Sequence, residues 1–190
     1  MKIQYICSLF LLISLSSCSK IISNLYGIRE PKIEKDITIF RYLKSKSMEE
    51  SNIYKCKGKE EYKNVFNYFN NNFPEALIFD KNGNQLLYKL DKQDCNAGLF
   101  NVIPNLEKNN NLKFGKLKIN DFKSKITPFN KSSKLFLNEK TDYYLFINWA
   151  VFIGNLNVDH VKKWEKLAIS NIKCKITVIK INMDLQEGWD

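Results

Sequence analysis

Cysteine and histidine are the side chains of this chain that could serve as nucleophiles, bases or metal ligands near neutral pH. The sequence contains five cysteines and one histidine. Cys56, Cys95 and Cys174 lie in the body of the chain, and none of them belongs to a Cys-x-x-Cys pair. Zinc sites need clustered cysteine and histidine ligands, so this spacing predicts neither a metal site nor another cofactor. His160 has no neighbour in sequence that would make it a catalytic base.

Cys56 and Cys95 are the two thiols for which a pairing can be argued. Cys95 stands near the start of an expected helix from Asp94 to Leu106, and a helix N-terminus lowers the pKa of a thiol. Cys174 opens an expected buried strand and is expected to be inert. Two interpretations therefore stay open for Cys56 and Cys95: a structural disulfide, or the redox pair of a thiol-disulfide enzyme.

The N-terminal residues have the layout of a secretory signal. Lys2 precedes an apolar core that is too short to span a bilayer as a permanent helix. The Leu-Ser-Ser-Cys sequence that ends at Cys18 resembles the lipobox of bacterial lipoproteins, in which the signal is cut before the cysteine and the thiol carries a diacylglycerol. We expect residues 1–17 to be a signal peptide, Cys18 to carry the lipid, and residues 18–35 to be a tether. An ordinary signal peptide that ends near a cysteine is the alternative.

The residues that follow Cys18 bear on where such a lipoprotein would reside. A serine at this position is similar to outer-membrane routing in well-studied envelope bacteria, and here it is Ser19. The chain lacks an acidic run after Cys18 of the kind that resembles a surface-export signal in some Bacteroidetes. We therefore expect a cell-envelope lipoprotein on the periplasmic face of the outer membrane, held to the membrane by its lipid anchor.

The charge of the chain invites a nucleic-acid interpretation, which the residue types argue against. The formal net charge is +10, with 30 lysines and arginines. Only Arg29 and Arg41 are arginines, whereas base and phosphate recognition relies on the forked donors of arginine. The lysines are spread along the chain, which is typical of a solvated surface. We therefore expect no nucleic-acid partner.

The strongest pattern in the chain is a strand, a helix and a second strand near its end. Tyr143 to Trp149 and Lys175 to Asn182 are runs rich in aromatic and β-branched residues, as expected for strands buried on both faces. Asn157 to Ser170 between them has apolar residues at helical spacing. This order predicts a βαβ crossover, with the two strands parallel and adjacent in one sheet.

A β-hairpin is the second clear pattern. Ala76 to Asp80 and Gln85 to Leu90 read as strands joined through an Asn-Gly turn. From Glu107 to Lys140 the pattern is weak and predicts only loops and one short helix. Together these elements predict an α/β fold, with helices on both faces of a sheet, in a single domain from residue 36 to residue 190.

Several of these segments resemble the thioredoxin family. Asn148 to Leu156, which begins Asn-Trp-Ala, resembles the segment in which a thioredoxin strand ends and the active-site helix begins. Ile176 to Asp184 is similar to the next thioredoxin strand, and Phe73 to Gly83 resembles the stretch in which a cis-proline precedes the hairpin. The resemblance implies that Cys95 to Leu106 is the helix that closes the domain.

Two departures from the thioredoxin pattern matter. The hairpin half precedes the βαβ half, so the resemblance implies a circularly permuted arrangement or a convergent sheet built from similar pieces. Ile153 and Leu156 stand where the family has its two cysteines. Because thiol exchange needs a thiolate and a resolving thiol, this site is expected to have no thioredoxin-type activity.

The resemblance leaves a binding function as the expectation for this region. The surface that it implies is formed by Trp149, Phe152, Ile153, Leu156 and Pro74, since the family binds peptides beside its Trp-Ala and cis-proline. We therefore expect a non-catalytic, lipid-anchored domain that binds another envelope protein or a peptide. The alternative is the thiol-disulfide enzyme that uses Cys95 and Cys56, and a purely structural role in the envelope also stays open.

Overall fold

The computed structural model describes residues 23–89, 96–108, 111–129 and 140–189 of the 190-residue chain. Its strands are β1 (Ile33–Glu34), β2 (Ile53–Cys56), β3 (Ala76–Asp80), β4 (Asn84–Leu87), β5 (Lys113–Lys118), β6 (Ile126–Pro128), β7 (Tyr143–Trp149), β8 (Ile176–Asn182) and β9 (Leu185–Gln186). Its helices are α2 (Asp36–Ser45), α3 (Lys59–Tyr68), α4 (Leu99–Asn105), α5 (Ile119–Lys123) and α6 (Lys163–Ile169), with short 3-10 turns at Asn96–Gly98 and Val151–Ile153 and a π-helix at Asn157–Lys162.

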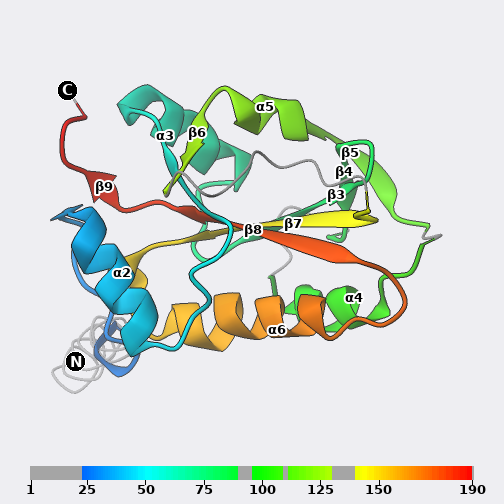
Figure 1. Ribbon diagram of the computed structural model, residues 1–190, viewed down its shortest axis with the longest axis horizontal. Coiled ribbons are helices and arrows are strands. Elements are labelled where there is room, and N and C mark those ends of the chain that lie inside the picture. The colour runs from blue at the N-terminus through cyan, green and yellow to red at the C-terminus, as the bar shows by residue number, and fades with distance from the viewer. Residues whose placement is uncertain (1–22, 90–95, 109–110, 130–139, 190) are drawn as a thin grey trace, which may run out of the picture.

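Seven of these strands form one mixed sheet in the order β5-β4-β3-β7-β8-β2-β6, drawn in Figure 1. The adjacent strands β7, β8 and β2 are parallel, whereas β3, β4, β5 and β6 pair antiparallel with their neighbours. The expected βαβ unit and the expected hairpin are both confirmed. The structure is therefore an α/β fold. Its buried strands β7 and β8 pair with a neighbouring strand on each side.

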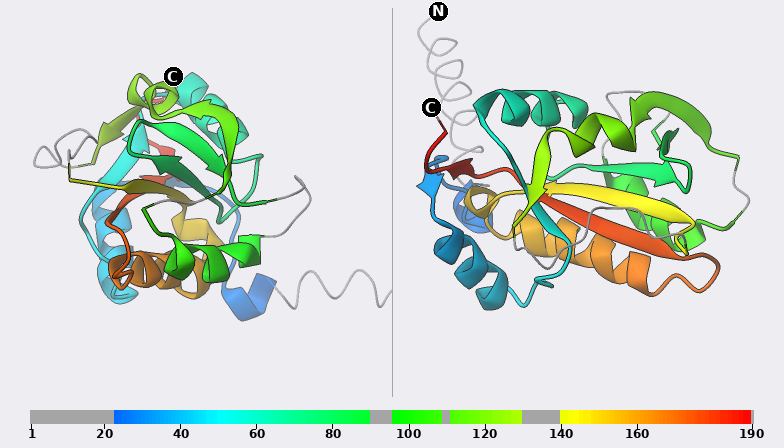
Figure 2. Two further views of the ribbon diagram at one scale, coloured as in Figure 1. Left: turned by 90° about the vertical axis from the view of Figure 1, so that its right-hand side faces the viewer. Right: turned by 45° about the horizontal axis from the view of Figure 1, so that its top comes forward.

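Helices cover both faces of this sheet. Ile39 of α2, Leu99 of α4 and Trp164 of α6 belong to the hydrophobic core on one face. Val65 of α3 and Phe122 of α5 belong to the core on the other face. Figure 2 shows the two layers of helices on opposite sides of the twisted sheet. No helix in the described ranges is long and apolar enough to cross a membrane.

The weak stretch from Glu107 to Lys140 contains two strands that the sequence pattern did not predict. β5 pairs with β4, and β6 pairs with β2, so they form the two edges of the sheet. β5 is almost wholly solvent-exposed or half-buried, which is why it lacks the apolar run of the central strands. Residues 130–139 of this stretch lie outside the described part of the chain.

Residues 23–35, which the sequence suggested as part of a tether, are packed against the body of the fold. The backbone N–H of Arg29 donates to the backbone O of Phe152 at 2.8 Å, and Asn155 N–H donates to Tyr26 O at 2.7 Å. β1 pairs parallel with β9. The tether interpretation is therefore limited to residues 18–22, which lie outside the described ranges together with the predicted signal peptide.

Candidate functional site

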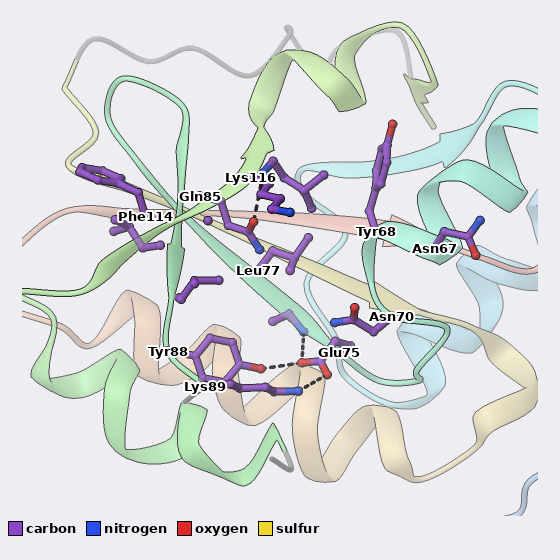
Figure 3. Close-up of a pocket in the computed structure, with 15 residues that line it drawn as sticks. Asn67, Tyr68, Asn70, Glu75, Leu77, Gln85, Tyr88, Lys89, Phe114 and Lys116 are labelled. Carbon is purple, nitrogen blue, oxygen red and sulfur yellow. Dashed lines mark hydrogen bonds and ion pairs between the residues drawn. The ribbon is translucent and has the colours of Figure 1, made fainter. Parts of the chain in front are cut away.

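A concave site is lined by residues of β3, β4 and β5 (Figure 3). This cavity, which we call the Glu75 pocket, has a volume of about 500 Å³. On the helix side its wall is formed by Asn67 and Tyr68 at the end of α3 and by Asn70 just after that helix. Pockets of this size with a few convergent polar groups are the usual binding sites of small ligands and peptide side chains.

A carboxylate is buried at one end of this pocket. Glu75, which is 3% exposed, accepts a hydrogen bond from the Tyr88 hydroxyl at 2.5 Å on Oε1. Its Oε2 lies 2.5 Å from Nζ of Lys89, and its Oε1 also accepts the Ala76 backbone N–H at 3.0 Å. Lys89 and Tyr88 thus provide the partners that a buried carboxylate needs and fix its orientation.

The rest of the pocket is mainly apolar. Leu77 of β3 and Leu87 of β4 line it from the sheet, and Phe114 of β5 stands at its margin. Gln85 crosses the floor, where its Oε1 accepts the backbone N–H of Leu117 at 3.2 Å. These apolar side chains beside a fixed ionic group suit a ligand that has both an apolar side chain and a polar backbone.

The sequence reasoning missed this pocket, although one signal for it was present. Glu75 directly precedes the apolar strand β3, where a carboxylate must be buried or stand at the strand end. The partners Tyr88 and Lys89 follow β4, so they reach Glu75 only because the hairpin folds back antiparallel. A local pattern cannot report this contact.

The side chains expected to form a binding surface lie together but are largely covered. Trp149, Ile153 and Pro74 are buried, and Phe152 and Leu156 are half-buried. The peptide bond between Phe73 and Pro74 is cis, and the rings of Phe73 and Phe152 meet edge to face with their centroids 5.4 Å apart. Trp149, Ile153 and Pro74 are therefore core residues here, which corrects the expectation that they line a surface.

The covering segment is the chain's own N-terminal portion. Residues 23–29 lie over the turn at Val151–Ile153, held by the two backbone hydrogen bonds at Phe152 and Asn155. Gly154 makes this approach feasible, because a Cβ at that position would overlap the backbone oxygens of Tyr26 and Gly27. Tyr42 of α2 stacks on Trp149 with ring centroids 6.2 Å apart and closes the other side.

Asn148 connects this covered region to the Glu75 pocket. Its Oδ1 accepts the Glu75 backbone N–H at 2.6 Å, and its backbone N–H donates to Glu75 O at 3.0 Å. Its Nδ2 donates to the backbone O of Asn72 at 2.7 Å. The segment around Pro74 is thus fixed to the end of β7.

The only histidine, His160, lies in an aromatic environment. His160 packs between the rings of Phe100 and Trp164, and burial lowers its pKa below the ordinary value. Within the described ranges, no group of three or more histidine, cysteine or acidic side chains is placed to hold a metal ion.

The environment of Cys56 bears on the thiol-enzyme alternative. Its thiol is 1% exposed, its Sγ lies 3.7 Å from Sδ of Met183, and burial, with a smaller effect of Glu61, raises its pKa to about 12. Such a thiol is almost wholly protonated at neutral pH and is a poor nucleophile. Cys95 and Cys18, the expected site of lipid attachment, lie outside the described residues.

We expect iodoacetamide at pH 8 to alkylate Cys56 at least about a hundredfold more slowly in the native protein than in urea, because its thiolate is rare and shielded. Peptide mass mapping after timed quenching measures this rate. Equal rates in the two states, or a reversible Cys56–Cys95 disulfide in redox buffers, would instead support the thiol-disulfide enzyme.

Comparisons of the chain with protein-family models, with curated proteins and with solved structures find no match. The functional interpretation therefore depends on the residues and their geometry.

Proposed function

We propose that this chain is a lipid-anchored protein of the bacterial cell envelope whose α/β domain binds another envelope protein or a peptide without catalysing a reaction. The observation that carries the binding function is the Glu75 pocket, an apolar cavity of about 500 Å³ with one fixed, buried carboxylate. The lipobox-like sequence ending at Cys18 supports the anchor. The periplasmic face of the outer membrane is the proposed location.

We further propose that the domain is a circularly permuted, thioredoxin-like arrangement. Its support is the spatial order of parallel β2, β8 and β7 followed by antiparallel β3 and β4, with the cis Phe73–Pro74 bond before β3. In the chain the hairpin precedes the βαβ unit, and β2, which pairs parallel with β8, precedes both. Ile153 and Leu156 supply no thiol, which favours binding over thiol exchange in this domain.

The anchor is tested by the variant Cys18→Ser. We expect the wild-type protein to fractionate with membranes, because acyl chains contribute ~0.8 kcal/mol for each CH₂ buried in lipid. The variant should lose this association, and intact mass of the extracted wild-type protein should show the added lipid. A wild-type protein without added mass at Cys18 would contradict the anchor and leave the binding proposal in place.

The binding function is tested with peptides selected from a random library on the purified protein in mild detergent. We expect Leu87→Ser to weaken the selected peptides by about tenfold, since it removes apolar contact area from the pocket. Ile172→Ser is the matched control, because Ile172 is 98% exposed in the turn between α6 and β8. Fluorescence anisotropy gives the dissociation constants. A failure to select any binding peptide, or equal effects of the two variants, would contradict the proposal.

A further inference from the structure

The two edges of the seven-stranded sheet differ in what they offer to another chain. Among the described residues, β5 pairs with β4 alone and β6 pairs with β2 alone. β6 has three residues and ends in Pro128, which has no backbone N–H to donate. β5 has six residues and therefore presents the longer row of backbone donors and acceptors.

A β-bulge alters β5 beside the Glu75 pocket. Asn84 pairs with Lys118 and Leu86 pairs with Phe114, so Gln85 stands opposite the residues between them. A bulge takes residues out of the ladder and bends the strand, and bulges are frequent next to functional sites. Gly115 and Lys116 of the bulge are themselves part of the pocket wall. The strand edge and the pocket therefore form one continuous surface.

The charge of this edge selects the kind of partner. Lys113, Lys116 and Lys118 are exposed on β5, whereas the nearby carboxylate of Glu75 is already paired with Lys89. Among the described residues the only carboxylate hydrogen-bonded to β5 is that of Asp121, at the backbone N–H of Lys118, so the edge carries an excess of positive charge that attracts an acidic chain.

An apolar contact point accompanies these charges. Phe114 is 67% exposed on β5 and lines the pocket together with Leu87. In an extended chain paired with β5, alternate side chains can enter the pocket. Lys113 and Lys116 stand on that same side of β5, because Lys113 is paired with Leu87 and Lys116 lines the pocket. Recognition by strand addition combines these two features with backbone hydrogen bonds.

We propose that β5 is a docking edge on which an extended, acidic segment of a partner protein pairs as an additional strand and places apolar side chains in the Glu75 pocket. This inference rests on the proposed binding function and specifies its ligand. The partner's segment combines acidic and apolar residues over about the length of β5.

The test uses the purified protein in mild detergent with three labelled synthetic peptides as long as β5. The first alternates glutamate with valine, the second replaces each glutamate with lysine, and the third is the first with N-methylated backbone amides. At low ionic strength we expect the acidic peptide to bind at least about tenfold more tightly than the lysine peptide, and salt to weaken it. N-methylation should weaken it by about tenfold or more, because the backbone donors are lost.

A pair of charge-reversed variants locates the site. We expect the double variant Lys113→Glu with Lys116→Glu to weaken the acidic peptide by about tenfold or more. Lys166→Glu with Lys173→Glu is the control of equal net charge, because both residues are exposed away from β5, on and just after α6. The control should change the affinity by less than about twofold. Circular dichroism checks that both proteins are folded.

Lysines on an edge strand can instead serve to prevent pairing with other chains. In that case the acidic and lysine peptides bind alike, or the β5 variant behaves as its control does, and the docking proposal is wrong. If library-selected peptides still bind and remain sensitive to Leu87→Ser, the proposed binding function survives that result. If neither selected nor designed peptides bind, both proposals fail.

Discussion

Replacing Glu165 with leucine should lower the free energy of unfolding by about 3–5 kcal/mol, because it leaves the charge of Lys180 buried without its partner. Lys180 is 0% exposed in the middle of β8, and its Nζ bonds the carboxylate of Glu165 on α6. The same Nζ donates to the backbone O of Glu49 at 2.7 Å. Urea unfolding followed by circular dichroism gives the free energy.

The pair is expected to be costly to break because both charges have been taken out of water. Burial raises the pKa of Glu165 above its ordinary value and lowers the pKa of Lys180, and in each case the partner opposes this shift. A lone buried ammonium keeps the cost of burial and loses the opposing attraction.

Two further variants separate this explanation from a simple loss of packing. The double variant Glu165→Leu with Lys180→Met should recover most of the lost stability, since no unpaired charge remains. Lys163→Ala breaks the exposed ion pair between Lys163 and Asp159 and should cost no more than about 0.5 kcal/mol. A loss below about 1 kcal/mol for Glu165→Leu alone would contradict the buried-charge argument.

The second large effect concerns pH and the carboxylate of Asp184 at the end of β8. Asp184 is 1% exposed, and its two oxygens accept the Val151 backbone N–H at 3.0 and 2.8 Å. Asn182 Nδ2 donates to Oδ2 at 2.7 Å. Burial, with a smaller contribution from the charge of Glu34, raises the pKa of Asp184 to about 6, and these hydrogen bonds oppose the shift.

The sign of the pH dependence follows from this raised pKa. The folded protein binds the Asp184 proton more readily than the unfolded chain does, whose carboxyl has a pKa of 3.8. The resulting stabilisation is fully present below pH ~4 and is lost as the pH rises through ~6, and it amounts to about 3 kcal/mol.

The variant Asp184→Asn removes this titration with little change in shape. We expect the difference in unfolding free energy between wild type and variant to shift by up to about 3 kcal/mol between pH 4 and pH 7, with wild type relatively more stable in acid. Urea titrations at several pH values measure this difference, in which groups common to both proteins, such as Glu165, cancel. A difference that does not vary with pH would show that Asp184 is not the titrating group.

The sequence alone determined the central part of this fold. The runs Tyr143 to Trp149 and Lys175 to Asn182 could be assigned because strands buried on both faces are rich in aromatic and β-branched residues. The helix between them and the Asn-Gly hairpin are also local patterns, so βαβ connectivity and an α/β class followed. The sequence also shows directly that Ile153 and Leu156 supply no thiol, since this depends only on residue type.

The tertiary structure decided which of these residues are accessible and where the pocket lies. Trp149 is buried with Tyr42 stacked on it, and residues 23–29 bond the nearby Phe152 and Asn155 from a distant part of the chain. β5 exists as a strand because β4 offers it a partner, although its own residues are mostly exposed. Glu75 meets Lys89 only after the hairpin has formed. Such contacts join residues that are far apart in sequence, so no local periodicity records them, and only the packed chain brings them together.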